Sequence, residues 1–402
     1  MDHRPLDGIR VLDLTVWQHG TYATAILSDL GADVIKVEER VSGDPGRHFW
    51  MTDTGLSSYF EAHNRGKRSV VIDLKRPEGR DVFLRLAAHA DGFLNNFRIG
   101  AIARLGLAYE DVATVNPRII YVQASGYGHL GDDAGLGSFD IIAQARGGIM
   151  SATGEPDDPP LPAGVPIADQ AGAMQACIAM LTGLVSRNLT GKGMRLDTSL
   201  LGTQVALQSF NVTNYLFSEK LIPRRPRGGS TPFWRVYQAG DGEWFVIGML
   251  LDRCWPEVTD VIGRPELLQD ERFDTYRKRT ADNAAALIAV LDDAFRAAPA
   301  REWVARLNAV GMFAAPVQDY PSLAKDPQVL ANGYIHEVDH PGHDPVRMAG
   351  VGIAVDGEPV TVPRLSPQHG EHTETVLLEA GYTWDDIQHL REANIIGPAT
   401  PA

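Results

Sequence analysis

Short apolar runs alternate with helix-patterned segments along the first third of the chain, and this alternation constrains the fold more than any other feature. Residues 9–14 form an apolar run that predicts a buried strand, and residues 34–37 predict a second one. The apolar residues between them recur at the spacing of one helix face: Ala23, Ile26, Leu27 and Leu30. A strand, a helix and a strand in this order predict parallel strands joined by a right-handed crossover.

The same pattern continues further along the chain. Residues 70–74, 93–97 and 119–123 predict three more strands, and a helix with Pro77 in its first turn is predicted after the first of these. We therefore predict an α/β fold with a Rossmann-like large domain and a parallel sheet. Two long helices are predicted at residues 168–188 and 199–217, and a helical tail at residues 366–390.

Composition marks a second, smaller domain. Residues 223–232 (PRRPRGGSTP) cannot sustain a regular element and predict a linker. Strand patterning follows over residues 234–251 around a turn at residues 240–242, and helical segments continue to about residue 310.

Charge and cysteine content exclude several classes of protein. The 37 Lys and Arg against 51 Asp and Glu give a formal net charge of −14, which argues against nucleic acid as a partner but not against a small phosphorylated ligand. Two distant cysteines, Cys177 and Cys254, give no disulfide framework and favour a cytoplasmic location. The first residues lack the shape of a signal peptide, and no apolar run approaches the roughly 18 residues of a membrane span.

A glycine-rich segment after the predicted strand at 119–123 resembles a dinucleotide fingerprint. GYGHLG, residues 126–131, fits G-x-G-x-x-G, but that fingerprint requires a helix to open at once. An acidic, glycine-rich stretch follows instead, in which Asp132 and Asp133 would repel a pyrophosphate. We therefore interpret the segment as a loop over an active site rather than as a nicotinamide or flavin site.

Two groups of histidines invite comparison with metal sites. His369, Glu371 and His372 do not have the H-E-x-x-H spacing, and we interpret them as the start of a helix. The second group is a polar loop containing His336, His340 and His343. We predict no metal in either place. No GxSxG elbow and no cysteine-protease signature is present, so serine or cysteine hydrolysis is unsupported.

Basic residues cluster near predicted strand ends despite the acidic whole. One cluster is residues 64–68 with Lys75 and Arg76, and another is Arg98 with Arg104. Loops at strand ends bind ligands in open α/β sheets, so these clusters indicate either a phosphate-bearing ligand or ordinary solvated surface.

Asp169 precedes a long apolar helix, and two roles are open for it. An aspartate in this place commonly caps the helix. The same position favours the ionised carboxylate, which can attack an acyl carbonyl and form a covalent intermediate.

Motifs along nearly the whole chain resemble one known family, the class III coenzyme A transferases. They are PLDGIRVLDL, GADVIKVE, SGDPGR, NRGKRSVVIDLKRPEGR, NNFRIGAIARLGL, NPRIIYVQASGYG, DIIAQARGGIMSATG, GKGMRLDTSLL and GEHTETVLLEAGY. The resemblance implies a large domain built from both chain ends, a smaller domain joined by two linkers, and an interlocked homodimer. With the composition, this plan gives a large-domain part at 1–205, a linker at 206–232, a small domain at 233–320, and a return linker with the rest of the large domain at 321–402.

The resemblance also implies roles for individual residues. Asp169, in the D-x-x-G setting that ends at Gly172, matches the family's nucleophile, and Gln18, His19 and Phe139 match positions near the thioester. The residues that match coenzyme A contacts are Leu74, Lys75, Asn96, Phe97, Arg98 and Arg104. A glycine-rich covering loop would correspond to residues 228–230.

The chain departs from the family pattern in three places. The family usually has Ala-Gly-Pro in the first loop, where this chain has His19-Gly20-Thr21. A residue that is usually basic in the family is Glu39 here, with Arg40 beside it. The GQTGP-type segment of the family is replaced by residues 132–137.

The expected function is transfer of coenzyme A from an acyl-CoA donor to a carboxylic acid acceptor through aspartyl anhydride and aspartyl-CoA thioester intermediates. No prosthetic group is expected, because the coenzyme A thioester is a substrate. An α-methylacyl-CoA racemase is the first alternative, although its histidine would fall on Phe139; His19 or His129 could substitute. A non-catalytic binder of coenzyme A esters and a Rossmann dehydrogenase are further alternatives.

Overall fold

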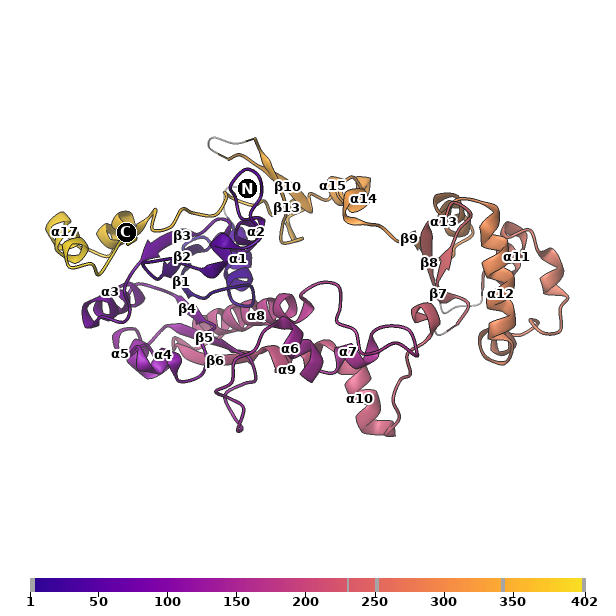
Figure 1. Ribbon diagram of the computed structural model, residues 1–402, viewed down its shortest axis with the longest axis horizontal. Helices are drawn as coiled ribbons and strands as arrows, with labels where there is room; N and C mark the ends of the chain where they lie inside the picture. The colour runs from indigo at the N-terminus through magenta and orange to yellow at the C-terminus, as the bar shows by residue number, and fades with distance from the viewer. Residues whose placement is uncertain (1–3, 230, 250–252, 341–343, 400–402) are drawn as a thin grey trace. The chain divides into compact units, whose positions relative to one another are not determined.

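The computed structural model describes residues 4–229, 231–249, 253–340 and 344–399 (Figure 1). Its contacts form two compact units. The first unit comprises Met1–Met150, Pro162–Glu219 and Pro327–Ala402, and the second comprises Ser151–Leu161 and Lys220–Asp326. Within the second unit, Arg224 joins its two segments by donating hydrogen bonds to the backbone oxygens of Ser151 and Asp158.

Six parallel strands form the sheet of the first unit, in the order β3-β2-β1-β4-β5-β6. The strands are β1 Arg10–Leu14, β2 Asp33–Glu38, β3 Arg68–Val71, β4 Gly92–Asn95, β5 Ile120–Ser125 and β6 Met194–Ser199. This is the strand order of the doubly wound Rossmann fold, so the predicted fold class is confirmed. The sequence reading missed β6, because its residues are only partly buried and give no apolar run.

Helices cover both faces of this sheet, and the strand period of two divides the side chains between them. Val11, Val34 and Ile120 pack with α1 (Thr21–Asp29) and α8 (Ile167–Thr190) on one face. On the other face, Leu12 and other strand residues pack with helices from both parts of the unit: α3 Pro77–Ala87, α5 Tyr109–Val115, α16 Thr373–Glu379 and α17 Trp384–Glu392. The chain end therefore returns to the sheet, as Figure 1 shows for the yellow segment beside β3.

Helix ends follow local chemistry. Pro77 opens α3, and Gly191, with a φ of 74°, ends α8. The single helix predicted at residues 199–217 is instead α9 (Leu200–Leu207) and α10 (Ser209–Ser218). They are separated at Gln208, which leaves the helical region with φ −100° and ψ 25° and donates through its amide to the oxygen of Gly147.

The predicted helical tail is also divided. α16 and α17 are separate because Gly381 adopts a φ of 81° and Thr383 then caps α17. The remaining helices and strands of the first unit are α2 Ser58–Asn64, α4 Ala101–Arg104, α6 Asp140–Arg146, α15 Pro327–Ala331, β10 Ile335–Val338, β11 Val346–Ala349, β12 Ala354–Val355 and β13 Glu358–Pro359, with a 3-10 helix at Pro45–His48. The short helix α7 (Ile149–Ala152) contains residues of both units.

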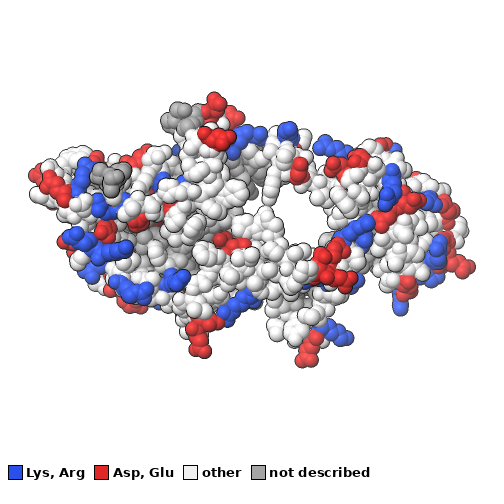
Figure 2. Space-filling view, in the orientation of Figure 1, with Lys and Arg blue, Asp and Glu red and all other residues white. Residues whose placement is uncertain are grey.

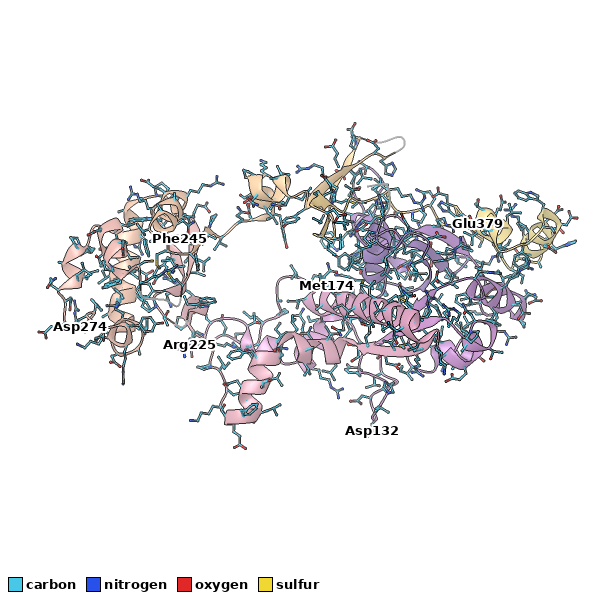
Figure 3. The ribbon with its side chains drawn as sticks, turned by 180° about the vertical axis from the view of Figure 1, so that it is seen from behind. Asp132, Met174, Arg225, Phe245, Asp274 and Glu379 are labelled. Atoms are coloured by element: carbon cyan, nitrogen blue, oxygen red, sulfur yellow. The ribbon has the colours of Figure 1, made fainter. Side chains whose placement is uncertain are left out.

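The second unit holds a three-stranded antiparallel sheet in the order β7-β8-β9. Its strands are β7 Trp234–Gln238, β8 Trp244–Gly248 and β9 Ala314–Pro316, and its α-helices are α11 Trp255–Val261, α12 Ala284–Ala294, α13 Ala300–Ala309 and α14 Tyr320–Leu323. Single-turn helical segments lie at Pro226–Gly228, Pro265–Leu268, Lys278–Asp282 and Phe295–Ala297. The core is aromatic: Phe245 on β8 (Figure 3) packs edge-on against Phe295, which in turn contacts Trp303.

No helix within the described ranges has both the length and the apolar character needed to cross a membrane. Cys177 and Cys254 are both buried and unpaired, in the first and the second unit respectively.

Candidate active site

A pocket of about 220 Å³ lies at the carboxyl ends of β1, β4 and β5 in the first unit. The strand order reverses between β1 and β4, and open α/β sheets bind their ligands at such a point. The pocket is lined by Val16, Trp17, His19, Asn96, Phe97, Arg98, Ala124, Ser125, Gly126, Ala134, Leu136, Gly137, Ser138, Phe139, Asp169 and Leu200. Six of the ten predicted site residues therefore share one pocket: His19, Asn96, Phe97, Arg98, Phe139 and Asp169.

The other four predicted residues lie outside this lining. Gln18 is buried in the loop after β1. Leu74 and Lys75 follow β3, the former partly buried against the core and the latter exposed, and Arg104 is exposed at the end of α4.

Asp169 occupies the third position of α8, because the helix begins at Ile167 after Pro166. The capping role considered for it is wrong. Asp140 satisfies the helix end instead: its Oδ1 accepts hydrogen bonds from the backbone nitrogens of Ala168 (2.7 Å) and Asp169 (3.2 Å). Among the described residues, the Asp169 carboxylate has no hydrogen-bond or ion-pair partner. It is left for a ligand.

Burial and the neighbouring Asp140 carboxylate raise the pKa of Asp169 to about 7. The sequence suggested the opposite, since a helix N-terminus favours a negative charge. Here desolvation and like-charge repulsion outweigh the helix dipole. At neutral pH, Asp169 is therefore close to half ionised, and its carboxylate is more basic than an exposed one.

His19 is buried against α8, and its Nε2 has no partner among the described residues. A Cβ atom on Gly172 would come within 2.9 Å of this nitrogen, so the glycine of the D-x-x-G motif makes room for the imidazole ring. Burial lowers the pKa of His19 to about 4, so the ring is neutral at physiological pH.

The loop after β1 is held in one conformation by polar contacts. Trp17 has a φ of 60°, which is rare for a residue with a side chain, and its backbone nitrogen donates to Oδ1 of Asp44 at 3.2 Å. Asn96 bonds both sides of Val16, accepting from its nitrogen at 3.0 Å and donating to its oxygen at 2.7 Å. Asn96 thus positions this loop, a role that no sequence pattern indicated.

A buried ion-pair network lies beneath the loop. Nζ of Lys36 is 2.8 Å from Asp44, and Nζ of Lys67 is 2.8 Å from Asp13, with all four side chains at most 1% exposed. Burial alone would raise the pKa of Asp13, but Lys67 and Lys36 hold it below its ordinary value. The two pairs fix β1, β2 and β3 relative to the loop.

The basic cluster at residues 64–68 is therefore not a phosphate site. Lys67 belongs to the buried network, Arg65 pairs with Asp29 at 2.7 Å, and Arg68 pairs with Asp33 at 2.6 Å. The adjacent buried strand residues were the signal that these cations point into the protein.

The glycine-rich loop over the pocket corresponds to the predicted one. Asp132 lies at its projecting end (Figure 3), and Ala134, Leu136 and Gly137 line the pocket. No helix opens directly after residue 131, because α6 begins at Asp140, so the dinucleotide fingerprint is excluded.

Two further departures have local explanations. The Glu39 carboxylate accepts hydrogen bonds from the backbone nitrogens of residues 41–43, and Arg40 bonds Gly397 and Asn394. Of the proposed covering loop, Gly228 and Gly229 belong to the second unit and Ser230 lies outside the described residues.

No group of three or more metal-ligating side chains is assembled in the part of the chain that the structure describes, which includes His336 and His340 but not His343. The pocket chemistry is thus that of one unpaired carboxylate, one neutral imidazole, one guanidinium and several apolar side chains.

The chain is similar to known proteins along most of its length. The chain matches CoA-transferase family III over residues 6–373. It is 32% identical over 398 residues to succinyl-CoA:glutarate CoA-transferase of Homo sapiens, covering 98% of this chain and 90% of that protein. It is 36% identical over 353 residues to acetyl-CoA:oxalate CoA-transferase of Acetobacter aceti, covering 86% and 90%. A CAIB/BAIF family protein from Brucella suis superposes with a TM-score of 0.83 at 33% identity, covering 94% of this chain and 99% of that one.

Proposed function

The chain belongs to CoA-transferase family III and is an enzyme of that class, and we propose that it transfers coenzyme A through covalent intermediates on Asp169. The observation that carries this proposal is the unpartnered Asp169 carboxylate in the switch-point pocket, with a pKa raised to about 7. A carboxylate with this basicity is a better nucleophile than an exposed one and is still substantially ionised at neutral pH.

The reaction has two halves, and each bond made replaces one broken. An Asp169 oxygen attacks the donor thioester carbon, the C–S bond breaks, and coenzyme A leaves as thiolate from an aspartyl–acyl anhydride. The thiolate then attacks the Asp169 carbonyl carbon, the C–O bond breaks, and the donor acid leaves as carboxylate. The resulting aspartyl-CoA thioester is attacked by the acceptor carboxylate, which again releases thiolate. Thiolate attack on the acceptor acyl carbon gives the product thioester and regenerates Asp169.

The remaining predicted residues follow strands β1, β3 and β4 in the chain and suit a long, phosphorylated substrate. Asn96, Phe97 and Arg98 line the pocket directly after β4. Lys75 and Arg104 are exposed beyond β3 and at the end of α4, where they can neutralise phosphate groups. We assign these residues, with Leu74 and Gln18, to coenzyme A.

We also propose that the enzyme is a homodimer, interlocked as the family resemblance implies. The supporting observation is apolar exposure on α8 and α10, where large side chains are between 48% and 88% exposed: Met174, Ile178, Val185, Leu189, Phe210, Leu216 and Phe217. Figure 2 shows a mostly uncharged area where Figure 1 labels α8, and Figure 3 labels Met174 on this helix from the opposite side. Sedimentation equilibrium should give about twice the chain mass, and Phe217→Asp should lower it.

We further propose a cytoplasmic location. The two buried cysteines form no disulfide, which suits a reducing compartment. Fractionation of the native host should recover the enzyme with cytoplasmic markers.

The central test is capture of the covalent intermediate. The protein is incubated briefly with acyl-CoA esters and analysed by mass spectrometry, with and without hydroxylamine. We expect a CoA-sized adduct on the peptide that contains Asp169, lost with hydroxylamine and absent from Asp169→Asn. The matched control is Asp385→Asn, another carboxylate in a first helical turn but exposed on α17, which should keep the adduct. Turnover without any adduct in the wild-type protein would contradict the proposal.

One observation favours a second candidate, racemase-type proton exchange. His19 and Asp169 line the same pocket, and a neutral imidazole beside a carboxylate could exchange protons on both faces of an α-carbon. His129 is not in this pocket; it lies in another, 3.9 Å from Asp197. Deuterium incorporation at the α-carbon of a 2-methylacyl-CoA, lost in His19→Ala, would establish this alternative.

A further inference from the structure

Four aromatic rings form a continuous wall around Trp17. The ring centroid of Trp17 lies 6.0 Å from Phe49, 6.4 Å from Tyr59 and 6.3 Å from Phe139, and each pair meets edge to face. Phe49 also contacts Tyr59 at 5.1 Å. We call these four residues the aromatic wall. Phe49 and Phe139 are 44% and 61% exposed, so the wall has apolar surface available to a ligand.

The aromatic wall adjoins the reacting carboxylate. Trp17 and Phe139 line the same pocket as Asp169. Tyr59 contacts Trp17 of this lining at 6.4 Å between ring centroids, and burial and then the Asp169 charge raise the pKa of the Tyr59 phenol. An acyl group bonded to Asp169 would therefore lie against these rings.

The wall is held rigidly. The backbone of Trp17 is fixed by Asp44, which is itself paired with Lys36 in the buried network. Phe139 immediately precedes α6, whose first residue, Asp140, is tied to the start of α8. A surface held in this way does not need to reorganise on binding.

The pocket offers little to a second carboxylate on the acyl group. Arg98 is the only Lys or Arg among the described residues that line it, and we assign Arg98 to coenzyme A. His19 is neutral. Arg47, near the wall, is already paired with Glu38 at 2.7 Å and stacked on Phe60 at 4.0 Å. From the described residues that line this pocket, a distal carboxylate would therefore lose its hydration without gaining a cation other than Arg98.

We propose that the acyl group transferred by this enzyme has an aromatic or bulky apolar body and no second carboxylate. The inference rests on the proposed function, because it concerns the acid that becomes bonded to Asp169. It separates this chain from the human relative, which is named for succinyl-CoA and glutarate. Trp17 and Phe139 are then the residues that determine specificity.

The test is identity exchange, in which one acid is both donor and acceptor. Phenylacetyl-CoA is incubated with deuterated phenylacetate, and succinyl-CoA with deuterated succinate, and label entering each thioester is followed by mass spectrometry. We expect kcat/KM to be about tenfold or more higher for the phenylacetyl pair. A preference for the succinyl pair would overturn this inference and leave the proposed function intact. No exchange with either pair, together with no hydroxylamine-sensitive adduct, would overturn both.

Variants of the aromatic wall test whether it causes the preference for the phenylacetyl pair. Phe139→Ala removes an exposed ring at little risk to folding and should reduce the ratio of the two kcat/KM values at least about threefold, mainly through KM for the phenylacetyl pair. Trp17→Ala should reduce it further. The matched control is Phe313→Ala, since Phe313 is 62% exposed but belongs to the second unit. An unchanged ratio in both wall variants, or an equal change in the control, would overturn the assignment.

Discussion

Asp13 and Asp169 are two carboxylates of the same unit whose surroundings push their pKa values in opposite directions. Asp13 is fully buried in β1, yet Lys67 lies 2.8 Å away and its pKa is lowered despite burial. Asp169, at the start of α8, has no cation partner among the described residues, and burial and then the Asp140 charge raise its pKa to about 7. Burial disfavours both charges, and the presence or absence of a counterion decides the outcome.

The difference separates a structural charge from the one that we propose to be reactive. The ionised Asp13 is satisfied by Lys67, Thr24 and the backbone of Thr15, so it fixes the loop that carries Trp17 and His19. The ionised Asp169 is satisfied by nothing in the described chain and stays available to a carbonyl carbon. Active sites commonly retain such destabilising groups because function requires them.

The largest expected effect comes from removing the ion pair between Lys67 and Asp13. Lys67→Met leaves the Asp13 carboxylate buried and unpaired, so we expect unfolding free energy to fall by about 3–5 kcal/mol. Urea unfolding at pH 7 measures this, since burial lowers the pKa of Lys67 only to about 8 and the ammonium remains protonated there. Arg76→Met, which removes the exposed pair with Glu78, is the control and should leave the unfolding curve unchanged. Equal curves for the two variants would show that the buried pair does not stabilise the fold.

The second prediction concerns the pH dependence of the first chemical step. Only ionised Asp169 can attack a thioester, and the group is protonated below its pKa of about 7. The rate of adduct formation should therefore be constant above about pH 8 and fall about tenfold per unit below pH 7, to roughly one hundredth at pH 5. Rapid-quench mass spectrometry at saturating acyl-CoA measures it, with circular dichroism checking that the fold persists. A rate unchanged down to pH 5 would mean that Asp169 titrates like an exposed carboxyl group.

The parts of the fold that depend on interactions between neighbouring residues could be predicted from the sequence, and the parts that depend on distant partners could not. Five of the six sheet strands were predicted because parallel strands covered on both faces are nearly continuous apolar runs, whereas β6 is a partly exposed edge. Pro77 marked the start of a helix correctly because its effect is on its own backbone.

The site was less accessible to sequence reasoning. From the residues alone, a helix cap was the favoured role for Asp169, and only the family resemblance favoured a nucleophile. The structure excludes the cap through Asp140, which is 29 positions earlier in the chain and accepts the hydrogen bonds of the helix end instead. Lys67 was grouped with surface cations for the same reason: its partner Asp13 is 54 positions away. Tertiary partners of this kind leave no local pattern.

A third prediction measures what the unpaired carboxylate costs the fold. Because folding raises the pKa of Asp169, its contribution to stability is lost as pH rises from its unfolded value near 3.8 to about 7. In Asp169→Asn this loss of stability does not occur. The unfolding free energy of the variant should therefore exceed that of the wild type by an amount that grows from about pH 3.8 to about pH 7 and stays constant above pH 7. The gain is at most about 4 kcal/mol at 1.36 kcal/mol per unit, and we expect about 1–3. Thermal unfolding at pH 4, 6 and 8 tests this, with Asp385→Asn as a control that should show no such trend. A gain independent of pH would contradict the burial argument.

The smallest expected effect separates the contributions of burial and of the Asp140 charge to the raised pKa of Asp169. Asp140→Asn removes the neighbouring charge but keeps an oxygen that can accept from the backbone nitrogens of Ala168 and Asp169. The fall in the rate of adduct formation at acid pH, the acid limb of the rate profile, should therefore move to lower pH. The start of α8 should be preserved. Because burial is the larger cause, the limb should remain above the range of an exposed aspartate. Asp140→Ala removes the cap as well and should also lower thermal stability, by about 1 kcal/mol. An acid limb that does not move in Asp140→Asn would assign the whole shift to desolvation, and the contrast between Asp13 and Asp169 would then depend on the counterion of Asp13 alone.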